Sequence, residues 1–332
     1  MASASARGSR AKGKSKTQTT GIFSEIQHKG APHKLAPIDH MVLMPLLRSR
    51  DVPKLLNFSA TYYFNHELWL NAWQAALGKS DFAVIKSIRL FVQLNSIHAS
   101  NLGAYFLPDG SKVTLPKDMI CKSVQGTQQY NCAPVISTEP SSPLDTSFQV
   151  VKSDCLVAAL DLVSQGLDPA VLVLASAYNP GGGYMEGAGA QEENLCRRTT
   201  LWQNLMDPFG VGGERKWVYP IPEFGAIYSP KVLVFRGEEK SGYAYLAEPV
   251  RLGFINSCAY RDPPVQTGKA GETRLSGKII GNYLNKIRAI FSVDLLYKSQ
   301  LFVGHSLSIY RIALNKCPGI LLHDKISTEA LI

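Results

Sequence analysis

A glycine-rich stretch followed by two adjacent carboxylates is the part of this chain that could do chemistry. Three consecutive glycines, Gly181, Gly182 and Gly183, come shortly before Glu192 and Glu193. Because glycine has no Cβ, its backbone N–H groups can approach phosphate oxygens closely. Two neighbouring carboxyl groups can supply acid and base catalysis at a sugar. The combination predicts chemistry on a phosphate-bearing sugar.

An apolar run at residues 171–177 leads into this loop. Short runs of this kind are typical of a strand that is buried on both faces. In open α/β sheets, ligands bind beyond the carboxyl ends of the strands. We therefore expect the loop to leave a central strand at the ligand-binding edge of a sheet.

Two other nucleotide-binding loops do not fit this stretch. The dinucleotide fingerprint needs a third glycine three residues after its second, but Glu186 and Glu192 stand at that distance from Gly183 and Gly189. A Walker loop ends in Gly-Lys-Ser or Gly-Lys-Thr, and neither tripeptide occurs in this stretch.

The two glutamates are predicted to lie in the first turn of a helix. Apolar residues recur after them at roughly helical spacing, and Asp207 with Pro208 would end the helix: Leu195, Trp202, Leu205 and Met206. Acidic residues there can simply compensate the helix dipole. Adjacent helical residues point about 100° apart, so one carboxylate can face a ligand while its neighbour is held by the protein. The nearby glycine loop favours this functional interpretation.

The motif Asn-Pro-Gly-Gly-Gly at residues 179–183, a spacer of seven residues and Gln-Glu-Glu at 191–193 resembles the signature of poly(ADP-ribose) glycohydrolases, in particular the microbial-type branch. Residues 150–156 resemble the strand-to-helix connection of that branch, and residues 227–236 its downstream strand. The resemblance covers roughly residues 85 to 304. It implies a macrodomain-like α/β fold with three α/β/α layers around a mixed sheet, preceded by a helical N-terminal extension, that binds ADP-ribose.

The resemblance also implies roles for single residues. Glu193 would be the catalytic acid/base, Glu192 would hold the ribose hydroxyls, and Gln191 would support both. Gly181, Gly182 and Gly183 would line the diphosphate, and Asn179 would contact the ribose beside the broken bond. If Gly182 serves the diphosphate, a valine there is expected to lower ADP-ribose affinity before it lowers thermal stability.

Asp154 has two interpretations of equal weight. The resemblance implies that it binds the adenine amino group. The pair Ser153-Asp154 is also a typical helix N-cap.

Cleavage of a ribose glycosidic bond sets the chemical demands on the site. A carboxyl group must protonate the departing oxygen and then activate water. To hold its proton near neutral pH it needs a raised pKa, which burial and a neighbouring carboxylate both supply. No metal and no cofactor are implied, since the sequence has no His-Glu-x-x-His motif and no close cysteine pair.

Composition places this domain in a chain of 332 residues with a net charge of +9. The six cysteines have no framework spacing, and Cys155 and Cys196 stand in apolar patterns, which favours a reducing compartment. No apolar run suits a signal peptide or a membrane span, so we expect a nuclear or cytoplasmic protein without a membrane partner.

The segments outside the motif region carry weaker signals. Residues 1–24 are predicted to be a disordered basic tail, which could contact nucleic acid or only aid solubility. Residues 25–84 are predicted to be a helical extension. Within it, residues 35–80 weakly resemble an F-box, a module that docks on a ubiquitin-ligase adaptor, but packing on the main domain is favoured. Residues 108–143 are predicted to be a loop-rich connection.

The end of the resemblance differs from the family. After residues 301–304 the microbial-type branch continues with a second glycine-rich loop, but this chain reads His305-Ser306-Leu307-Ser308. Residues 305–332 are therefore predicted to be an atypical tail.

Three functions follow. The chain could be a hydrolase of poly(ADP-ribose) or of ADP-ribosylated protein or nucleic acid, a non-catalytic ADP-ribose-binding module, or an adaptor that brings ADP-ribosylated targets to a ubiquitin ligase. Retention of both glutamates favours the hydrolase.

Overall fold

The computed structural model describes residues 64–134, 151–208 and 210–259, the short segments 265–267, 273–275 and 301–303, and Ile290. The predicted basic tail, the part of the F-box-like segment before residue 64, and the predicted tail at residues 305–332 lie outside these residues.

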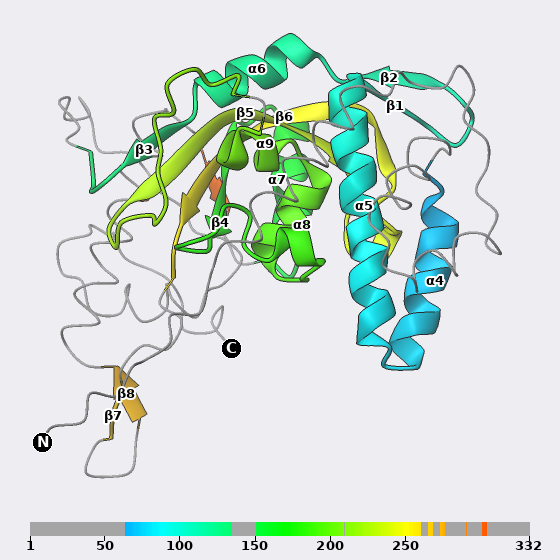
Figure 1. The fold of residues 1–332 in the computed structure, drawn as a ribbon, viewed down its shortest axis with the longest axis horizontal. Helices are drawn as coiled ribbons and strands as arrows, with labels where there is room; N and C mark the ends of the chain where they lie inside the picture. Colours follow the sequence, from blue (N-terminus) through cyan, green and yellow to red (C-terminus); the bar gives the residue numbers. More distant parts are fainter. Residues whose placement is uncertain are drawn as a thin grey trace, which may run out of the picture.

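The described residues contain both helices and strands (Figure 1). In chain order they are α4 (His66–Gly78), α5 (Phe82–Leu102), β1 (Ala104–Phe106), β2 (Lys112–Thr114), α6 (Lys117–Gln125), β3 (Gln128–Tyr130), α7 (Cys155–Ser164), β4 (Pro169–Leu174), η1 (Tyr184–Glu186), α8 (Gln191–Arg198), α9 (Leu201–Met206), β5 (Ala226–Arg236), η2 (Glu239–Ser241), β6 (Tyr245–Ser257), β7 (Val265–Thr267), β8 (Thr273–Leu275) and β9 (Leu301–Val303).

The main sheet has five strands in the order β3-β5-β6-β4-β9. β4 runs parallel to both of its neighbours, β6 and β9, whereas β5 is antiparallel to β3 and β6. Every residue of β4 except the last is buried, as a strand with neighbours on both sides and covered faces requires. The predictions of a mixed sheet and of a buried strand before the glycine loop are confirmed.

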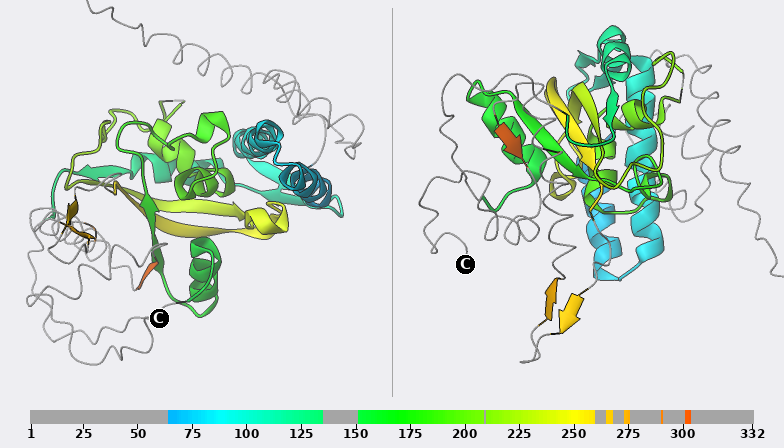
Figure 2. Two further views of the ribbon diagram at one scale, coloured as in Figure 1. Left: turned by 90° about the horizontal axis from the view of Figure 1, so that it is seen from below. Right: turned by 90° about the vertical axis from the view of Figure 1, so that its left-hand side faces the viewer.

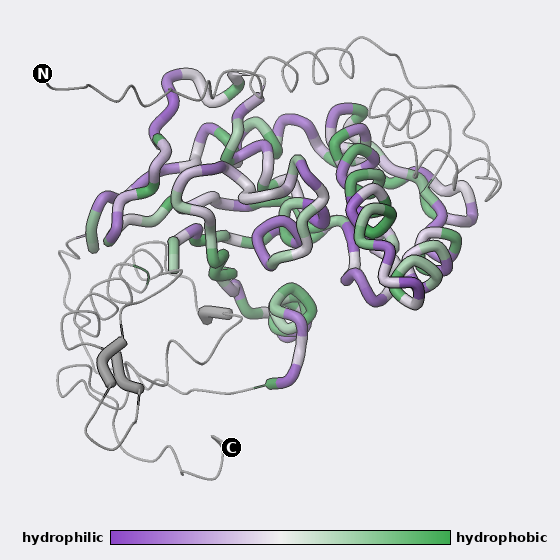
Figure 3. The backbone as a smooth tube through the Cα atoms, turned by 60° about the horizontal axis from the view of Figure 1, so that its bottom comes forward, coloured by the Kyte–Doolittle hydropathy of each residue, from purple (hydrophilic) through white to green (hydrophobic). Residues whose placement is uncertain are grey.

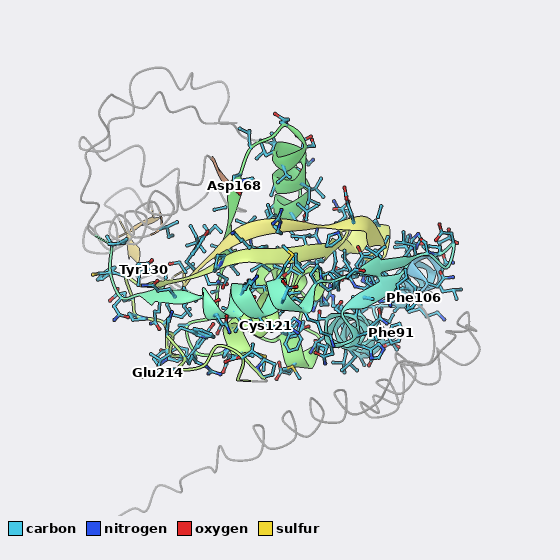
Figure 4. All side chains as sticks on the ribbon, turned by 90° about the horizontal axis from the view of Figure 1, so that it is seen from above. Phe91, Phe106, Cys121, Tyr130, Asp168 and Glu214 are labelled. Atoms are coloured by element: carbon cyan, nitrogen blue, oxygen red, sulfur yellow. The ribbon has the colours of Figure 1, made fainter. Side chains whose placement is uncertain are left out.

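Helices cover both faces of this sheet (Figure 2). α7 lies on one face, and α8, α9 and α5 lie on the other. The view from above shows α6, where Cys121 is labelled, on the side of the sheet opposite to α7 (Figure 4). The expected three-layer α/β/α arrangement is therefore present.

The described part of the N-terminal extension, residues 64–84, contains α4 and the first residues of α5, and these two helices pack together. Asn65 and Asp81 cap α4 and α5 by accepting from the N–H groups of Leu68 and Val84. The buried Trp69 of α4 donates its indole N–H to the Ile88 carbonyl of α5 at 3.0 Å. Hydrophobic and hydrophilic residues alternate along both helices (Figure 3). Over these residues, the packing interpretation is correct.

The prediction of a loop-rich connection at residues 108–143 is wrong for its described part. This segment contains the hairpin strand β2, the helix α6 and the strand β3. The hydroxyl of Ser123 in α6 donates to the Pro230 carbonyl of β5 at 2.5 Å, and Ile120 and Val124 are buried. A short amphipathic helix that is stabilised by tertiary contacts shows little local signal.

The single helix predicted after the glutamates is two helices. Thr199 is extended between α8 and α9, and Thr200 exchanges two hydrogen bonds with Leu233 of β5: its N–H donates to the Leu233 carbonyl at 2.9 Å, and its Oγ1 accepts from the Leu233 N–H at 3.1 Å. These bonds to the sheet replace the helical bonds that would have continued α8. Asp207 ends α9 in the left-handed region, as expected for a stop at that position.

No helix among the described residues is both long enough and apolar enough to cross a membrane.

Candidate active site

The glycine loop turns sharply after β4 and ends at the first residue of α8. Gly182 donates its N–H to the Asn179 carbonyl at 2.9 Å, and Tyr184 donates to the Gly181 carbonyl at 3.0 Å. Gly181 and Gly182 have φ values of +72° and +60°, a region that favours glycine. The loop then makes the short helix η1 and reaches Gln191.

Gln191 ties α8 to the end of β4. Its Oε1 accepts from the Leu174 N–H at 2.8 Å, and its Nε2 donates to the Leu172 carbonyl at 2.9 Å. β9 pairs with β4 only as far as Val171, so the Gln191 amide satisfies backbone groups of β4 beyond that pairing. The predicted supporting role of Gln191 therefore takes a specific form, since it anchors the helix that carries both glutamates.

The two glutamates point into the loop from the first turn of α8. The Ser176 N–H donates to Glu192 Oε2 at 2.7 Å, and the Gly183 N–H donates to Glu193 Oε1 at 2.7 Å. Both side chains are buried. Glu192 Oε1 and Glu193 Oε2 are buried with no hydrogen-bond partner among the described residues. Each carboxylate is thus held by one oxygen and keeps the other for a ligand or a proton.

Gly182 lies directly against both carboxylates. A Cβ at this position would come within 2.5 Å of Glu193 Oε1 and 2.9 Å of Glu192 Oε2. The close approach of the two glutamates therefore requires a glycine at this position, independently of any contact between the loop and a diphosphate. The expectation that a valine at 182 would lower affinity before stability stays a prediction. The structure adds that the larger side chain would also meet the buried carboxyl groups of Glu192 and Glu193.

Burial gives Glu192 an unusual titration. It raises the pKa of Glu192 from 4.5 to about 8; the Ser176 hydrogen bond opposes this rise, and the neighbouring Glu193 carboxylate adds to it. At neutral pH Glu192 therefore holds a proton. The sequence analysis required a raised pKa of the carboxyl group that protonates the departing oxygen, a role assigned to Glu193; the raised pKa lies at Glu192, the residue assigned to the ribose hydroxyls.

Glu192 is expected to make stability depend on pH. Between pH 4.5 and 8 the folded protein holds the Glu192 proton and the unfolded chain does not, so the free energy of unfolding falls as pH rises through this window. The slope from one such group is at most about 1.4 kcal/mol per pH unit. The substitution Glu192→Gln should remove this pH dependence, because an amide does not titrate. Denaturant unfolding from pH 5 to 8 should show the variant gaining stability relative to the native chain; a pH-independent difference would contradict the burial argument.

Asp154 caps a helix and pairs with a buried arginine. One of its oxygens accepts from the N–H groups of Leu156 and Val157 at the start of α7. Arg198 of α8 donates to both oxygens at 2.9 and 3.0 Å. The N-cap interpretation is confirmed. The contact with adenine stays a prediction.

The structure brings some of the predicted residues together and sets others apart. Gly182 and Gly183 touch the glutamates, and Gly181 stands in the same turn. Asn179 is exposed at the start of this turn, where its N–H donates to the Ser176 hydroxyl at 3.2 Å. Asp154 lies at the far end of α8 from both glutamates, against Arg198.

Two residues of the site were missed by sequence reasoning. Ser176 supplies the N–H that holds Glu192. The Tyr219 hydroxyl is buried without a hydrogen-bond partner among the described residues, and burial together with the Glu192 carboxylate raises the Tyr219 pKa. Its loop is attached to the end of the apolar run by the Ile221 N–H, which donates to the Ala177 carbonyl at 2.8 Å. A backbone donor and a lone tyrosine leave no pattern in a sequence.

No group of three or more metal-ligating side chains occurs among the described residues. Cys155 and Cys196, predicted to be reduced and buried, are free and buried.

Comparison with known proteins agrees with this geometry. Residues 95–237 match the family model of the microbial-type poly(ADP-ribose) glycohydrolase (PARG) catalytic domain. The structure is similar to that of PARG from Thermomonospora curvata, with 25% sequence identity and a TM-score of 0.50, over 64% of this chain and 77% of that chain. A PARG structure from Deinococcus radiodurans in complex with ADP-ribose has 23% identity and a TM-score of 0.38, over 54% of this chain and 71% of that chain. No curated protein matches the chain.

The glycine loop, Gln191 and both glutamates all lie inside the matched region. The part of the chain that matches the catalytic-domain model of microbial-type poly(ADP-ribose) glycohydrolases therefore contains the candidate active site.

Proposed function

We propose that this protein hydrolyses the ribose glycosidic bonds of poly(ADP-ribose), with Glu193 as the catalytic acid/base and Glu192 as the group that holds the ribose hydroxyls. One observation carries the proposal: two adjacent buried carboxylates are each bound through one oxygen by a backbone N–H, and each keeps a second oxygen without a partner among the described residues.

The chemistry follows from these positions. Departure of the glycosidic oxygen builds positive charge on the anomeric carbon, and a carboxyl group close to that oxygen can supply the proton it needs. Glu193 then accepts a proton from the attacking water, so one residue serves both steps. Because Glu192 holds a proton at neutral pH, it can donate a hydrogen bond to a ribose hydroxyl.

The glycine loop accounts for the substrate class. Gly181, Gly182 and Gly183 follow the carboxyl end of β4, where ligands of open α/β sheets bind. We assign them to the diphosphate, Asn179 to the ribose beside the broken bond, and Asp154 to adenine. The three-layer fold is consistent with a macrodomain-like binding site for ADP-ribose. We also propose ADP-ribosylated proteins or nucleic acids as substrates. We propose a nuclear or cytoplasmic location, which is consistent with the free buried thiols of Cys155 and Cys196, since thiols stay reduced in those compartments.

A release assay tests the function directly. The full chain is incubated with labelled poly(ADP-ribose), and free ADP-ribose is measured with time; in parallel, titration calorimetry measures binding of ADP-ribose. We expect release and binding. Binding without release would instead support a non-catalytic ADP-ribose-binding module, and the absence of both would overturn the proposal.

A further inference from the structure

One face of α5 forms a wall against the glycine loop. A Cβ on Gly187 would collide with the carbonyl oxygen of Lys86, and a Cβ on Gly189 would collide with the guanidinium of Arg89. Gln93 Nε2 lies 3.2 Å from Met185 Sδ. Residues 86, 89 and 93 are spaced by three and four, so they lie on one side of the helix. These contacts involve Met185 of η1 and Gly187 and Gly189 of the segment between η1 and α8.

Arg89 is itself held in place by a two-pronged ion pair. Its Nε donates to Glu239 Oε1 at 2.8 Å, and its Nη2 donates to Glu239 Oε2 at 3.2 Å. Both side chains are only 18% exposed, so solvent screens this pair less than a surface pair. A guanidinium bound along two parallel lines cannot rotate away from Gly189 without breaking both bonds.

The same pair is linked to the other side of the loop. The Tyr243 hydroxyl donates to Glu239 Oε1 at 3.3 Å and accepts from Arg197 Nε at 3.1 Å. Arg197 Nη1 donates to the Ala188 carbonyl at 2.8 Å. The residues just before α8 therefore lie between Arg89 of α5, which packs against Gly189, and Arg197 of α8, which binds the Ala188 carbonyl. Because these residues lead directly into α8, their packing also constrains the position of its first turn, which carries Glu192 and Glu193.

We infer that Arg89 is a positioning residue for the catalytic glutamates, acting through the Arg89–Glu239 pair on the loop at residues 184–190. The inference rests on the proposed function. Arg89 precedes residue 95, where the family match begins, so this element of the active site comes from the N-terminal helix pair.

The test compares Arg89→Gln, Glu239→Gln and the double variant with the native chain. Misplacement of reacting groups by about 1 Å can cost 10²-fold in rate, so we expect each single variant to lower kcat by about 10-fold to 100-fold with little change in KM. The double variant should be no slower than the slower single variant, because all three lose the same interaction. Arg89→Lys should not restore kcat, since an ammonium cannot make the two-pronged bond.

Lys122→Gln and Asp118→Asn are the matched controls. They break an ion pair of α6 whose side chains are 77% and 69% exposed, and they should leave kcat unchanged. A kcat of Arg89→Gln within twofold of these controls, or additive effects of the two single variants, would overturn the inference.

Hydrogen exchange tests the positioning role of Arg89 without any measurement of turnover. The backbone N–H groups of residues 184–190 should exchange faster in Arg89→Gln than in the native chain, with no such change in the α6 controls. If the native chain releases no ADP-ribose, the proposed function fails while this comparison still decides the positioning role. Equal exchange in both proteins would refute it.

Discussion

Glu193→Gln is expected to abolish turnover of poly(ADP-ribose) and to leave ADP-ribose binding nearly unchanged. The amide keeps the size of the side chain, and its oxygen can still accept from the Gly183 N–H, but it cannot give up and regain a proton. General acid–base catalysis is typically worth about 10²–10⁴ in rate, which sets the expected loss. Release of labelled ADP-ribose measures turnover, and titration calorimetry measures binding.

Glu67→Gln is the matched control for this substitution. Glu67 also lies in the first turn of a helix, α4, but its side chain is exposed, so the variant should keep native turnover. Glu192→Gln completes the comparison. Because Glu192 is protonated at neutral pH, an amide reproduces its donor, and the loss should be smaller than that of Glu193→Gln. The opposite ranking would exchange the roles of the two glutamates.

Gly182→Ala is expected to damage catalysis and stability together. The new Cβ would lie 2.5 Å from Glu193 Oε1 and 2.9 Å from Glu192 Oε2, so the loop or the carboxylates must move. A shift of about 1 Å at reacting groups can cost about 10²-fold in rate. The φ value of +60° adds about 1–2 kcal/mol of backbone strain to any residue with a Cβ. Release kinetics and thermal melting measure the two effects.

Gly213→Ala is the control that separates the effect of backbone strain from the effect of a steric collision. Gly213 has a φ value of +68°, and a Cβ there meets nothing within 4 Å, so this variant carries the backbone strain without the steric overlap. It should lose some stability and keep its turnover. If Gly182→Ala kept turnover within a few-fold of Gly213→Ala, the glutamates would not depend on the shape of this turn.

Local pattern was sufficient for the chemistry-bearing residues and for the elements beside them. The apolar run at residues 171–177 predicted β4, because a strand buried on both faces must be apolar throughout. The triple glycine and the glutamate pair predicted a loop and the first turn of a helix, and both are present. Ser153-Asp154 predicted an N-cap, which needs only short-range hydrogen bonds. These signals are local, so one sequence can show them.

Contacts between distant segments decided the rest. The break between α8 and α9 depends on Thr200 meeting Leu233, and α6 is held by β5, which follows it by about a hundred residues. The ion pair between Arg198 and Asp154 could not be predicted for the same reason, since the two residues are 44 positions apart in the sequence.

The catalytic pair shows the same division between sequence and tertiary structure. Its residue types and its need for a raised pKa follow from the sequence. The raised pKa of Glu192 depends on the burial of its side chain, and the Ser176 N–H that opposes this rise reaches the carboxylate only in the folded chain. The wall formed by Arg89 depends on an ion pair between residues 150 positions apart. The sequence by itself determined the chemistry that is available, and only the tertiary structure decided which atoms meet, because burial and long-range contacts exist only once the chain has folded.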